Sequence, residues 1–519
     1  MMKIYIFLLL AGLTFSAAQS QEIADALRYS QDNLSGTARF RAMSGAFGAL
    51  GGDLSSINLN PAGSAIFANN QLAITLSSFN KKNDSNYFGT TTSASDNSFD
   101  MNQTGGVFVF KNHNPSSNWK KFSMAIDYEI TNNFDNSIFS AGTNPTNSVD
   151  NYFLSYANVN SQQNQSGIPL GTIQNYYYEE LNFADQQAFL GYEGYIINAI
   201  PLASDPSNNE NPNIASYSTN IPTGGNYYQE NVITSGGYNG KLSFNAATSY
   251  KDKFYFGINL NSYFTDYTQS TNFYEDNNNS QTNGLRNLSF RNEQYTYGSG
   301  FSFQIGAIAK ITNEIRFGLA YESPTWYNLN DVMRQNLSTR GFNYGNPPIS
   351  GLSNKSTDSD LEITYDPYKL QTPSKINGSF AYIFGKNALI SVDYGVKNYS
   401  STKYTEQPDF RSYNINSKLK NELKTTNELR IGAEYKIKEW SLRGGYRFEE
   451  SPYKDASTIG DLNSFSGGLG YNFGMFKLDF AYTNAQRNSQ QGFFNQGFTD
   501  GAKINTTDNN FSMTLLFEM

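Results

Sequence analysis

Side chains that commonly carry enzymatic or metal chemistry are scarce in this sequence. It has no cysteine and a single histidine, His113, in the stretch Asn112-His113-Asn114-Pro115. Thiol enzymes, zinc fingers and iron–sulfur proteins need cysteine, and a Ser-His-Asp triad needs a histidine beside its nucleophile. The residues around His113 are typical of a turn. We therefore expect no catalytic residue, no metal site and no cofactor, and we predict that the protein is not an enzyme.

Arginines and carboxylates form a second group with chemical potential. Five arginines are candidates: Arg39, Arg41, Arg316, Arg443 and Arg447. Carboxylates alternate with apolar or small residues in the same way at Asp127, Glu129, Glu434, Glu449 and Asp479. An arginine can bind the carboxylate of a ligand through two parallel hydrogen bonds. It can equally pair with a carboxylate of the protein, and the sequence leaves both interpretations open.

A glycine-rich segment near the N-terminus contains Gly45, Gly48, Gly51 and Gly52. A phosphate-binding loop follows a strand, opens a helix and ends in Lys-Ser/Thr, and none of these features is present here. Small residues also allow backbones to pack closely. We therefore expect a compact segment that packs inside a larger structure.

The rest of the chain supplies strands that would position the charges. Apolar residues occupy every second position in many segments, and the positions between them are polar, charged or small. A period of two is typical of a strand with one apolar face. The segments are 122–130, 254–260, 315–321, 388–396, 429–437, 440–448, 476–482 and 511–519.

Short and long connections alternate between these segments. The short ones lie near 112–120, 251–252, 312–314, 385–387, 438–439 and 474–475, and the long ones near 81–100, 132–235, 268–285, 324–372, 401–420, 451–462 and 488–508. Tight periplasmic turns and long extracellular loops are typical of outer-membrane barrels. We predict an all-β fold, a 14-stranded antiparallel transmembrane β-barrel, with strands near 71–80, 101–111, 121–131, 236–250, 253–267, 286–311, 314–323, 373–385, 388–400, 421–437, 439–450, 462–473, 475–487 and 509–519.

The composition is compatible with this fold. The chain has 519 residues, with 37 Lys+Arg against 45 Asp+Glu, a formal charge of −8 and 15% aromatic residues. An acidic chain argues against nucleic-acid binding, and the aromatic content argues against disorder. A polar lumen explains why the mean hydropathy is only −0.54.

The N-terminus predicts export. Residues 1–20 contain Lys3, the apolar run Ile4–Phe15 and the small residues Ser16, Ala17 and Ala18. The run is short of the ~20 residues of a membrane helix and fits a signal peptide. We divide the chain into a signal peptide at 1–20, an N-terminal plug at 21–70 and the barrel at 71–519, with 132–235 as the largest loop.

The segment 36–63 resembles the N-terminal hatch of the FadL/TodX (OMPP1) outer-membrane transport family. The resemblance rests on an Asn-Pro-Ala triplet before the first strand and on residues around it. The motif residues are Gly45, Gly48, Asp53, the triplet Asn60, Pro61 and Ala62, and Gly63. The clear match is confined to this segment. The likeness of the remaining chain is architectural.

The resemblance implies passive uptake of a hydrophobic small molecule, of the long-chain fatty acid or aromatic-hydrocarbon class, across the outer membrane of a Gram-negative cell. A hatch inside the lumen would gate it, and the ligand would leave sideways into outer-membrane lipid. Glycines that are candidate bulge sites for the opening are Gly105, Gly106, Gly444, Gly445, Gly467 and Gly468. The resemblance implies a monomer. The alternative is a surface-secretion or structural barrel of the same family without a transport role.

The predicted loop 132–235 is too long for a plain hairpin connection. Its helix-like stretches carry the apolar residues Phe153, Leu154, Phe189, Leu190, Tyr195 and Ile196. Apolar residues on a loop are expected to pack against a surface or bind a ligand. They are therefore candidates for a ligand groove, and the alternative is a cap over the barrel mouth.

Overall fold

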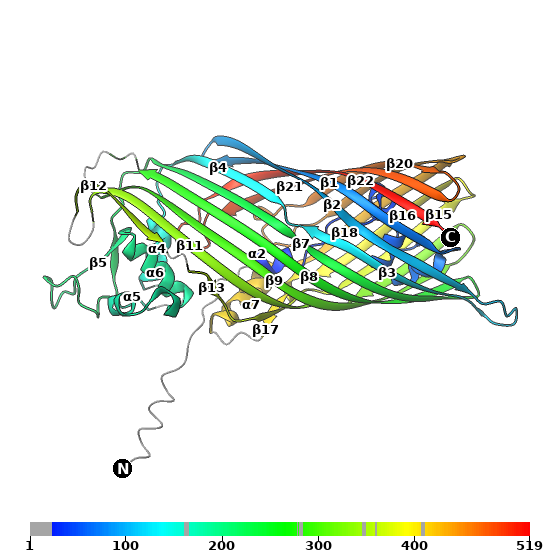
Figure 1. The fold of residues 1–519 in the computed structure, drawn as a ribbon, viewed down its shortest axis with the longest axis horizontal. Helices are drawn as coiled ribbons and strands as arrows, with labels where there is room; N and C mark the ends of the chain where they lie inside the picture. The colour runs from blue at the N-terminus through cyan, green and yellow to red at the C-terminus, as the bar shows by residue number, and fades with distance from the viewer. Residues whose placement is uncertain are drawn as a thin grey trace, which may run out of the picture.

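The computed structural model describes residues 23–159, 166–277, 279, 284–344, 349–358, 361–405 and 410–519. The predicted signal peptide at 1–20 lies outside the described residues. The chain forms a closed antiparallel β-barrel with helices inside it and at one end (Figure 1). Within the described ranges, no helix is long and apolar enough to cross a membrane.

Fourteen strand positions form the wall, and several consist of two strands separated by a break. In wall order they are β1 (Gln71–Tyr87), β2 (Thr90–Lys111), β3 (Trp119–Asn133) continued by β4 (Asn136–Asn144), β7 (Tyr227–Tyr250), β8 (Phe254–Asn277), β9 (Gly284–Lys310), β10 (Ile315–Glu322) continued by β11 (Trp326–Tyr344), β15 (Lys375–Phe384) preceded by β14 (Tyr368–Gln371), β16 (Ala388–Asn398) followed by β17 (Lys403–Thr405), β18 (Thr425–Ile437), β19 (Trp440–Glu449), β20 (Leu462–Asn472), β21 (Phe476–Gly492) and β22 (Gly501–Glu518). Pairing of β22 with β1, from Gln71↔Glu518 to Asn86↔Lys503, closes the ring. The predicted 14-stranded barrel is confirmed.

Several strands run much further than the sequence predicts. The predicted loop 81–100 is a hairpin, because β1 and β2 stay paired up to Tyr87↔Thr90. The predicted loop 268–285 is largely strand, since β8 and β9 remain paired up to Asp276↔Asn287. The predicted loop 324–372 contains β11 with its partners β12 (Ile349–Asp358) and β13 (Ile363–Thr364). Polar strand residues above the membrane resemble loop composition, so the loop prediction was wrong there.

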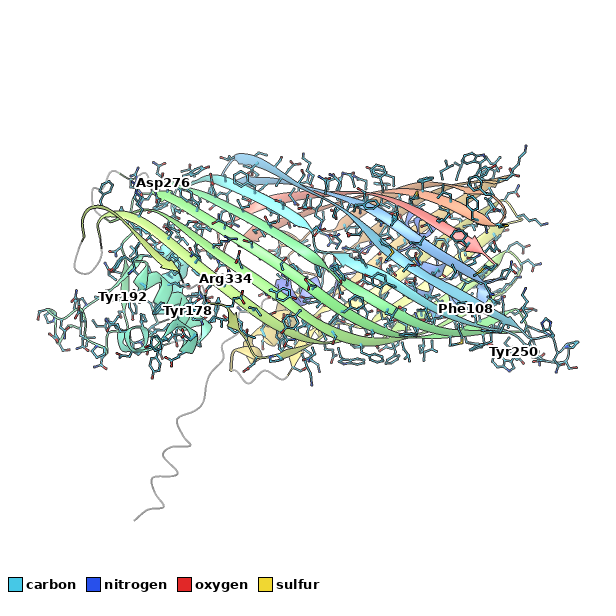
Figure 2. All side chains as sticks on the ribbon, in the orientation of Figure 1. Phe108, Tyr178, Tyr192, Tyr250, Asp276 and Arg334 are labelled. Carbon is cyan, nitrogen blue, oxygen red and sulfur yellow. The ribbon has the colours of Figure 1, made fainter. Side chains whose placement is uncertain are left out.

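The apolar face of the wall changes from the outside to the inside along its height. In the lower half of β8, Phe254, Phe256 and Ile258 are exposed on the outside, whereas Asn259 and Asn261 are buried inside. In the upper half, polar residues such as Asp276 lie outside, and Tyr267 and Phe273 are buried inside. Figure 2 shows Phe108 and Tyr250 near the end that carries the short turns and Asp276 at the other. The lower half therefore faces lipid around a polar lumen, and the upper half encloses an apolar core in water.

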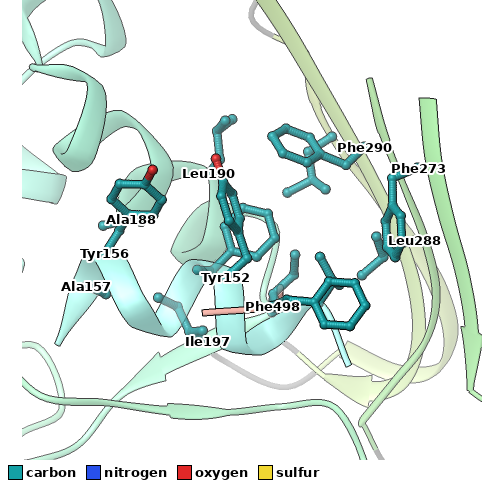
Figure 3. Packing of buried hydrophobic residues seen from close by; sticks show 14 of the residues in the cluster. Tyr152, Tyr156, Ala157, Ala188, Leu190, Ile197, Phe273, Leu288, Phe290 and Phe498 are labelled. Carbon is teal, nitrogen blue, oxygen red and sulfur yellow. The ribbon is translucent and has the colours of Figure 1, made fainter. Parts of the chain in front are cut away.

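The core of the upper half is an extracellular cap made of loop elements. These elements are α4 (Asp150–Ala157), α5 (Leu170–Asn175), η3 (Tyr178–Glu180), α6 (Phe183–Glu193), β5 (Ile197–Ala199) and β6 (Tyr217–Thr219). Figure 3 shows Tyr152 and Leu190 of the cap close to Phe273 and Phe290 of the wall and to Phe498. The Phe153 and Phe290 rings lie 5.5 Å apart. Another loop carries the helix α7 (Phe410–Glu422), which follows β17.

The hatch, residues 23–70 of the described chain, lies in the lumen and is built from four short helices. They are α2 (Ile23–Arg28), α3 (Ala38–Ala42), η1 (Leu54–Asn58) and η2 (Pro61–Ile66). The Ala38 N–H donates to Thr514 Oγ1 of β22 at 2.7 Å, and the Gln304 amide of β9 donates to the Asn58 carbonyl at 3.0 Å. These contacts reach opposite sides of the wall, so the hatch fills the bore as predicted.

Candidate functional site

The Asn-Pro-Ala triplet shapes the last helix of the hatch. The Asn60 Oδ1 accepts from the Ala62 N–H at 3.1 Å and so caps η2, and Pro61 occupies the first helical turn, where no N–H is needed. The Asn60 Nδ2 donates to the Gly48 carbonyl at 2.7 Å and to the Ala307 carbonyl of β9 at 3.1 Å. A single asparagine thus ties the helix, the hatch and the wall together.

Asp53 organises the other turn of the hatch. Its Oδ1 accepts from the Ser55 N–H at 3.1 Å, which caps η1, and from the Thr37 hydroxyl at 2.7 Å. Burial raises the pKa of the Asp53 carboxyl, and the nearby Arg39 guanidinium opposes this shift. The Gly48 N–H donates to the Asp393 carboxylate of β16 at 3.0 Å.

Glycines of the wall let the hatch approach the strands. A Cβ atom at Gly257, Gly306 or Gly318 would lie within 2.4 Å of the hatch at Pro61, Asn60 or Gly48. On the opposite side, Cβ atoms at Gly432, Gly445 and Gly468 would lie within 2.6 Å of the segment 42–44. We call these six positions the glycine seat. The nearest hatch atom is a side-chain atom at Gly306 and Gly468 and a backbone atom at the other four, and each contact is too close for a Cβ.

Within the hatch, Gly45 has φ of +77°, a backbone conformation that favours glycine. Gly63 packs directly on Gly51, because a Cβ at Gly51 would lie 2.9 Å from the Gly63 Cα. The predicted hatch motif therefore consists of two caps, a proline start and close glycine contacts.

One group of predicted lumen charges forms a buried ion-pair network across the hatch and the wall. The Glu434 carboxylate of β18 accepts from Arg39 of the hatch at 2.8 Å and from Arg443 of β19 at 2.7 Å. Arg443 also pairs with Asp479 of β21 at 2.5 Å. Arg39 and Arg443 are thus paired with protein carboxylates.

A second network surrounds Arg447. Its guanidinium pairs with Glu428 at 3.2 Å and with Glu449, and it donates to the Asp32 carbonyl of the hatch at 2.7 Å. Lys375 bridges Glu428 at 2.7 Å and the Asp32 carboxylate at 3.2 Å. Because most of these side chains are buried, mutual pairing offsets much of their desolvation.

Arg41 and Arg316 differ from the other three arginines. Arg41 is fully buried, and within the described residues its guanidinium makes one hydrogen bond, to the Ser77 hydroxyl of β1 at 3.1 Å. Arg316 donates to the Leu50 carbonyl of the hatch at 2.9 Å. In both residues at least one guanidinium nitrogen has no hydrogen-bond partner among the described residues. Arg39 is thus paired with a wall carboxylate, one of the two interpretations that the sequence allows, whereas within the described residues Arg41 forms no ion pair.

A layer of tyrosines crosses the lumen beyond the hatch. Its members are Tyr29, Tyr263, Tyr267, Tyr327, Tyr368, Tyr399, Tyr404 and Tyr453, and they pack with Ala26 and Leu27 of α2. The ring centroids of Tyr29 and Tyr327 are 5.4 Å apart. The Arg28 guanidinium lies 3.7 Å from the centre of the Tyr267 ring, a cation–π contact.

A cavity of about 100 Å³ lies where the tyrosine layer meets the hatch. Its lining includes Tyr263 and Tyr327 of the wall and Phe40 and Leu59 of the hatch. Cations and carboxylates complete the lining at Asp32, Glu129, Lys241, Lys375, Lys397 and Arg430. The cavity therefore combines aromatic faces with charged groups.

The wall is interrupted beside the hatch, between β2 and β3. Pairing of these strands ends at Gln103↔Glu129, and in the described segment 90–144 no backbone pair joins residues 90–102 to residues 130–144. Each edge carries a bulge, with Asn102 as the extra residue of β2 and Thr131 as that of β3. We call this interruption the wall gap. The glycines that were candidate bulge sites lie in strands that pair without a register shift at those residues, so the bulges occur elsewhere.

Polar side chains close the wall gap. The Asn133 amide of β3 donates to the Asp100 carboxylate at 2.9 Å and to the Ser98 hydroxyl at 3.1 Å, both on β2. Higher up, the Lys81 ammonium donates to the Asp135 carbonyl at 3.0 Å. Side-chain bonds of this kind are broken more easily than a strand ladder, since water competes for each one.

The structure brings the six candidate groove residues together in the cap. Phe153, Leu190 and Ile196 are fully buried in its core. The other three, Leu154, Phe189 and Tyr195, are partly buried and pack against that core.

Sequence reasoning missed the glycine seat and the bulges. An isolated glycine at an inward position of a strand, such as Gly257 between Phe256 and Ile258, indicates a close backbone approach and was a usable signal. The bulge at Asn102 was not predicted from the local sequence, in which Met101 precedes Asn102 and Gln103 follows it.

Comparisons with known proteins agree on the family. Residues 215–513 match the model of the outer membrane protein transport protein (OMPP1/FadL/TodX) family. A FadL homologue from Pseudomonas aeruginosa has a similar structure, with a TM-score of 0.54, 12% identity and coverage of 94% of this chain and 99% of that one. The P. putida toluene transporter TodX gives a TM-score of 0.49, with 11% identity and coverage of 94% of this chain and 99% of that one. A deltaS2 mutant of the TodX monoaromatic hydrocarbon channel gives a TM-score of 0.50, with 11% identity and coverage of 93% of this chain and 98% of that one. No curated protein sequence matches the chain.

The family model covers more than half of the sequence, and the fold agrees with it. This is a family of outer-membrane transport proteins rather than of enzymes, and membership places the protein in the outer membrane. The chain belongs to the outer membrane protein transport family OMPP1/FadL/TodX.

Proposed function

We propose that the protein takes up a hydrophobic small molecule, of the long-chain fatty acid or aromatic-hydrocarbon class, by passive diffusion through the outer membrane. Movement of the hatch gates the passage, and the molecule leaves sideways through the wall gap into the bilayer. The observation that carries this proposal is that the pairing of β2 with β3 ends at Gln103↔Glu129, beside a hatch that contacts opposite sides of the wall.

The layers of the lumen support an inward route for a hydrophobic ligand. The cap presents an apolar core above the membrane, and the tyrosine layer follows it. The cavity below the tyrosines offers aromatic faces to a hydrocarbon and places Lys375 and Arg430 within reach of a carboxylate. An apolar solute would otherwise meet the polar headgroups and sugars of the cell surface.

The experiment is uptake by cells that lack their own transporter of this family, with and without the gene for this protein. The probes are radiolabelled oleate and radiolabelled toluene, presented separately. Uptake of either one above the empty-vector rate supports transport and assigns the ligand class. Equal uptake of both probes with and without the gene contradicts the proposal and favours a surface-secretion or structural role.

A matched conductance measurement separates transport from porin behaviour. The purified barrel in a planar bilayer is expected to show mostly closed traces, because the hatch occupies the bore. A steady, large conductance in wild-type protein contradicts hatch gating.

A further inference from the structure

The edge of β3 at the wall gap lacks a strand partner, and the hatch supplies hydrogen bonds in its place. The Ser35 hydroxyl donates to the Ile130 carbonyl of β3 at 2.6 Å. The Asn33 amide donates to Asn132 Oδ1 at 2.5 Å, and the Asn132 amide donates to the Arg28 carbonyl at 3.2 Å. The buried Ile130 carbonyl needs such a partner, and Asn33 and Arg28 add contacts to Asn132, so the hatch segment 28–35 binds the free edge of β3.

The same hydroxyl also reaches the opposite edge of the gap. The Asn102 amide, on the bulge of β2, donates to Ser35 Oγ at 3.3 Å. A hydroxyl donates one hydrogen bond and accepts others, so Ser35 links the two edges through one oxygen atom. Ser35, Ile130 and Asn102 are all buried, which shields these bonds from competing water.

Among the described residues, the Asn102 side chain makes no hydrogen bond besides the one to Ser35. Its Oδ1 is buried and unpaired. The bulge turns both Asn102 and Gln103 toward the lumen. Gln103 belongs to the paired part of the wall, where its amide donates to Asp127 of β3 at 2.7 Å. The last ladder pair of β2 and β3, Gln103↔Glu129, is therefore followed immediately by a contact that runs through the hatch.

We propose that the hatch segment 28–35 is a clasp that holds the wall gap shut, with Ser35 as its positioning residue. Release of the Ser35 hydroxyl from Ile130 and Asn102 removes the link through the hatch and leaves β2 and β3, within the described residues, joined above Gln103 by the side-chain bonds of Asn133, which water can replace. The clasp rests on the proposed function, since it gives the hatch its control over lateral exit. It makes gap opening and hatch movement one event.

The test measures the gap directly by pulsed electron paramagnetic resonance. The chain has no cysteine, so Ser95→Cys on β2 and Thr234→Cys on β7 accept one spin label each. Both positions are exposed, and they lie on opposite sides of the gap. In this labelled background, Ser35→Ala removes the clasp and Ser35→Thr retains the hydroxyl. Ser30→Ala is the matched control, because its buried hydroxyl bonds only to Ala26 within the hatch.

We expect Ser35→Ala to add a longer-distance population and to shift the closed-to-open ratio by roughly 10- to 30-fold, the effect of two net hydrogen bonds. Ser35→Thr and Ser30→Ala keep the wild-type distance. If the Ser35→Ala barrel does not fold, Asn102→Ala removes the other half of the link and is expected to add the same longer-distance population. An unchanged distance in the folded variant overturns the clasp.

Oxidation of a Ser35→Cys, Asn102→Cys pair, with disulfide formation checked by mass spectrometry, supplies the transport readout. We expect uptake of oleate or toluene to stop on oxidation and to return on reduction, and continued uptake through the oxidised protein overturns the clasp. If Ser35→Ala widens the gap but wild-type protein takes up neither probe, the clasp stands and the transport proposal fails.

Discussion

The glycine seat gives the sharpest prediction about the hatch. In the variant Gly306→Ala, the new Cβ would lie 2.1 Å from Asn60 Oδ1 and 2.9 Å from Pro61 Cδ. Ordinary contacts begin near 3.4 Å, so the Asn60 side chain must move by more than an ångström. The strand cannot yield instead, because β9 is paired on both sides at this height.

The energetic effect follows from the bonds that Asn60 makes. A shift of this size breaks its contacts with the Ala62 N–H, the Gly48 carbonyl and the Ala307 carbonyl. Three hydrogen bonds at about 1 kcal/mol each amount to about 3 kcal/mol. Since about 1.4 kcal/mol is a factor of ten, the ratio of seated to displaced hatch falls about 100-fold.

The assay is single-channel recording in planar bilayers, with heat-modifiable gel mobility to verify that each barrel is folded. We expect Gly306→Ala to open much more often than wild type. The control is Gly444→Ala, whose Cβ meets only the Ser466 carbonyl oxygen at 3.8 Å, and it keeps the wild-type traces. A folded Gly306→Ala barrel with wild-type conductance refutes the account of the seat.

Three further predictions concern the ion pairs, the cap and the tyrosine layer. Glu434→Gln leaves Arg39 and Arg443 without their shared carboxylate and lowers the free energy of unfolding in urea by about 3–5 kcal/mol. The control Asp84→Asn, in an exposed ion pair, leaves the urea midpoint of unfolding unchanged. Phe290→Ala empties part of the cap core and destabilises it locally by about 3–5 kcal/mol. Limited proteolysis should therefore cut the loop 145–226 while the barrel keeps its gel mobility. A variant that resists the protease as well as the wild type contradicts this packing. Tyr327→Phe keeps the ring contacts but removes the acceptor of the Asn239 amide at 3.0 Å. Thermal unfolding should show a loss of about 1 kcal/mol, whereas Tyr435→Phe, at an exposed tyrosine, should show none.

Local pattern determined the membrane half of the fold. Residues such as Phe254, Phe256 and Ile258 alternate with polar ones, and one side of the wall must face lipid, so a period of two was enough to predict a barrel of 14 strands. The same rule failed above the membrane. There Asp276 faces water and Phe273 faces the core, and a polar exterior on a long strand has the composition of a loop.

The candidate site depended on tertiary structure. Arg39 meets Glu434 across 395 positions of sequence, and Ala38 meets Thr514 across 476, and no local pattern specifies such pairs. The sequence by itself marked the hatch through its glycines and Asn-Pro-Ala, because caps and close contacts need those residue types nearby. Only the closed barrel decided that Ser35 meets both Asn102 and Ile130, since that contact exists only when the ring brings β2 and β3 beside the hatch.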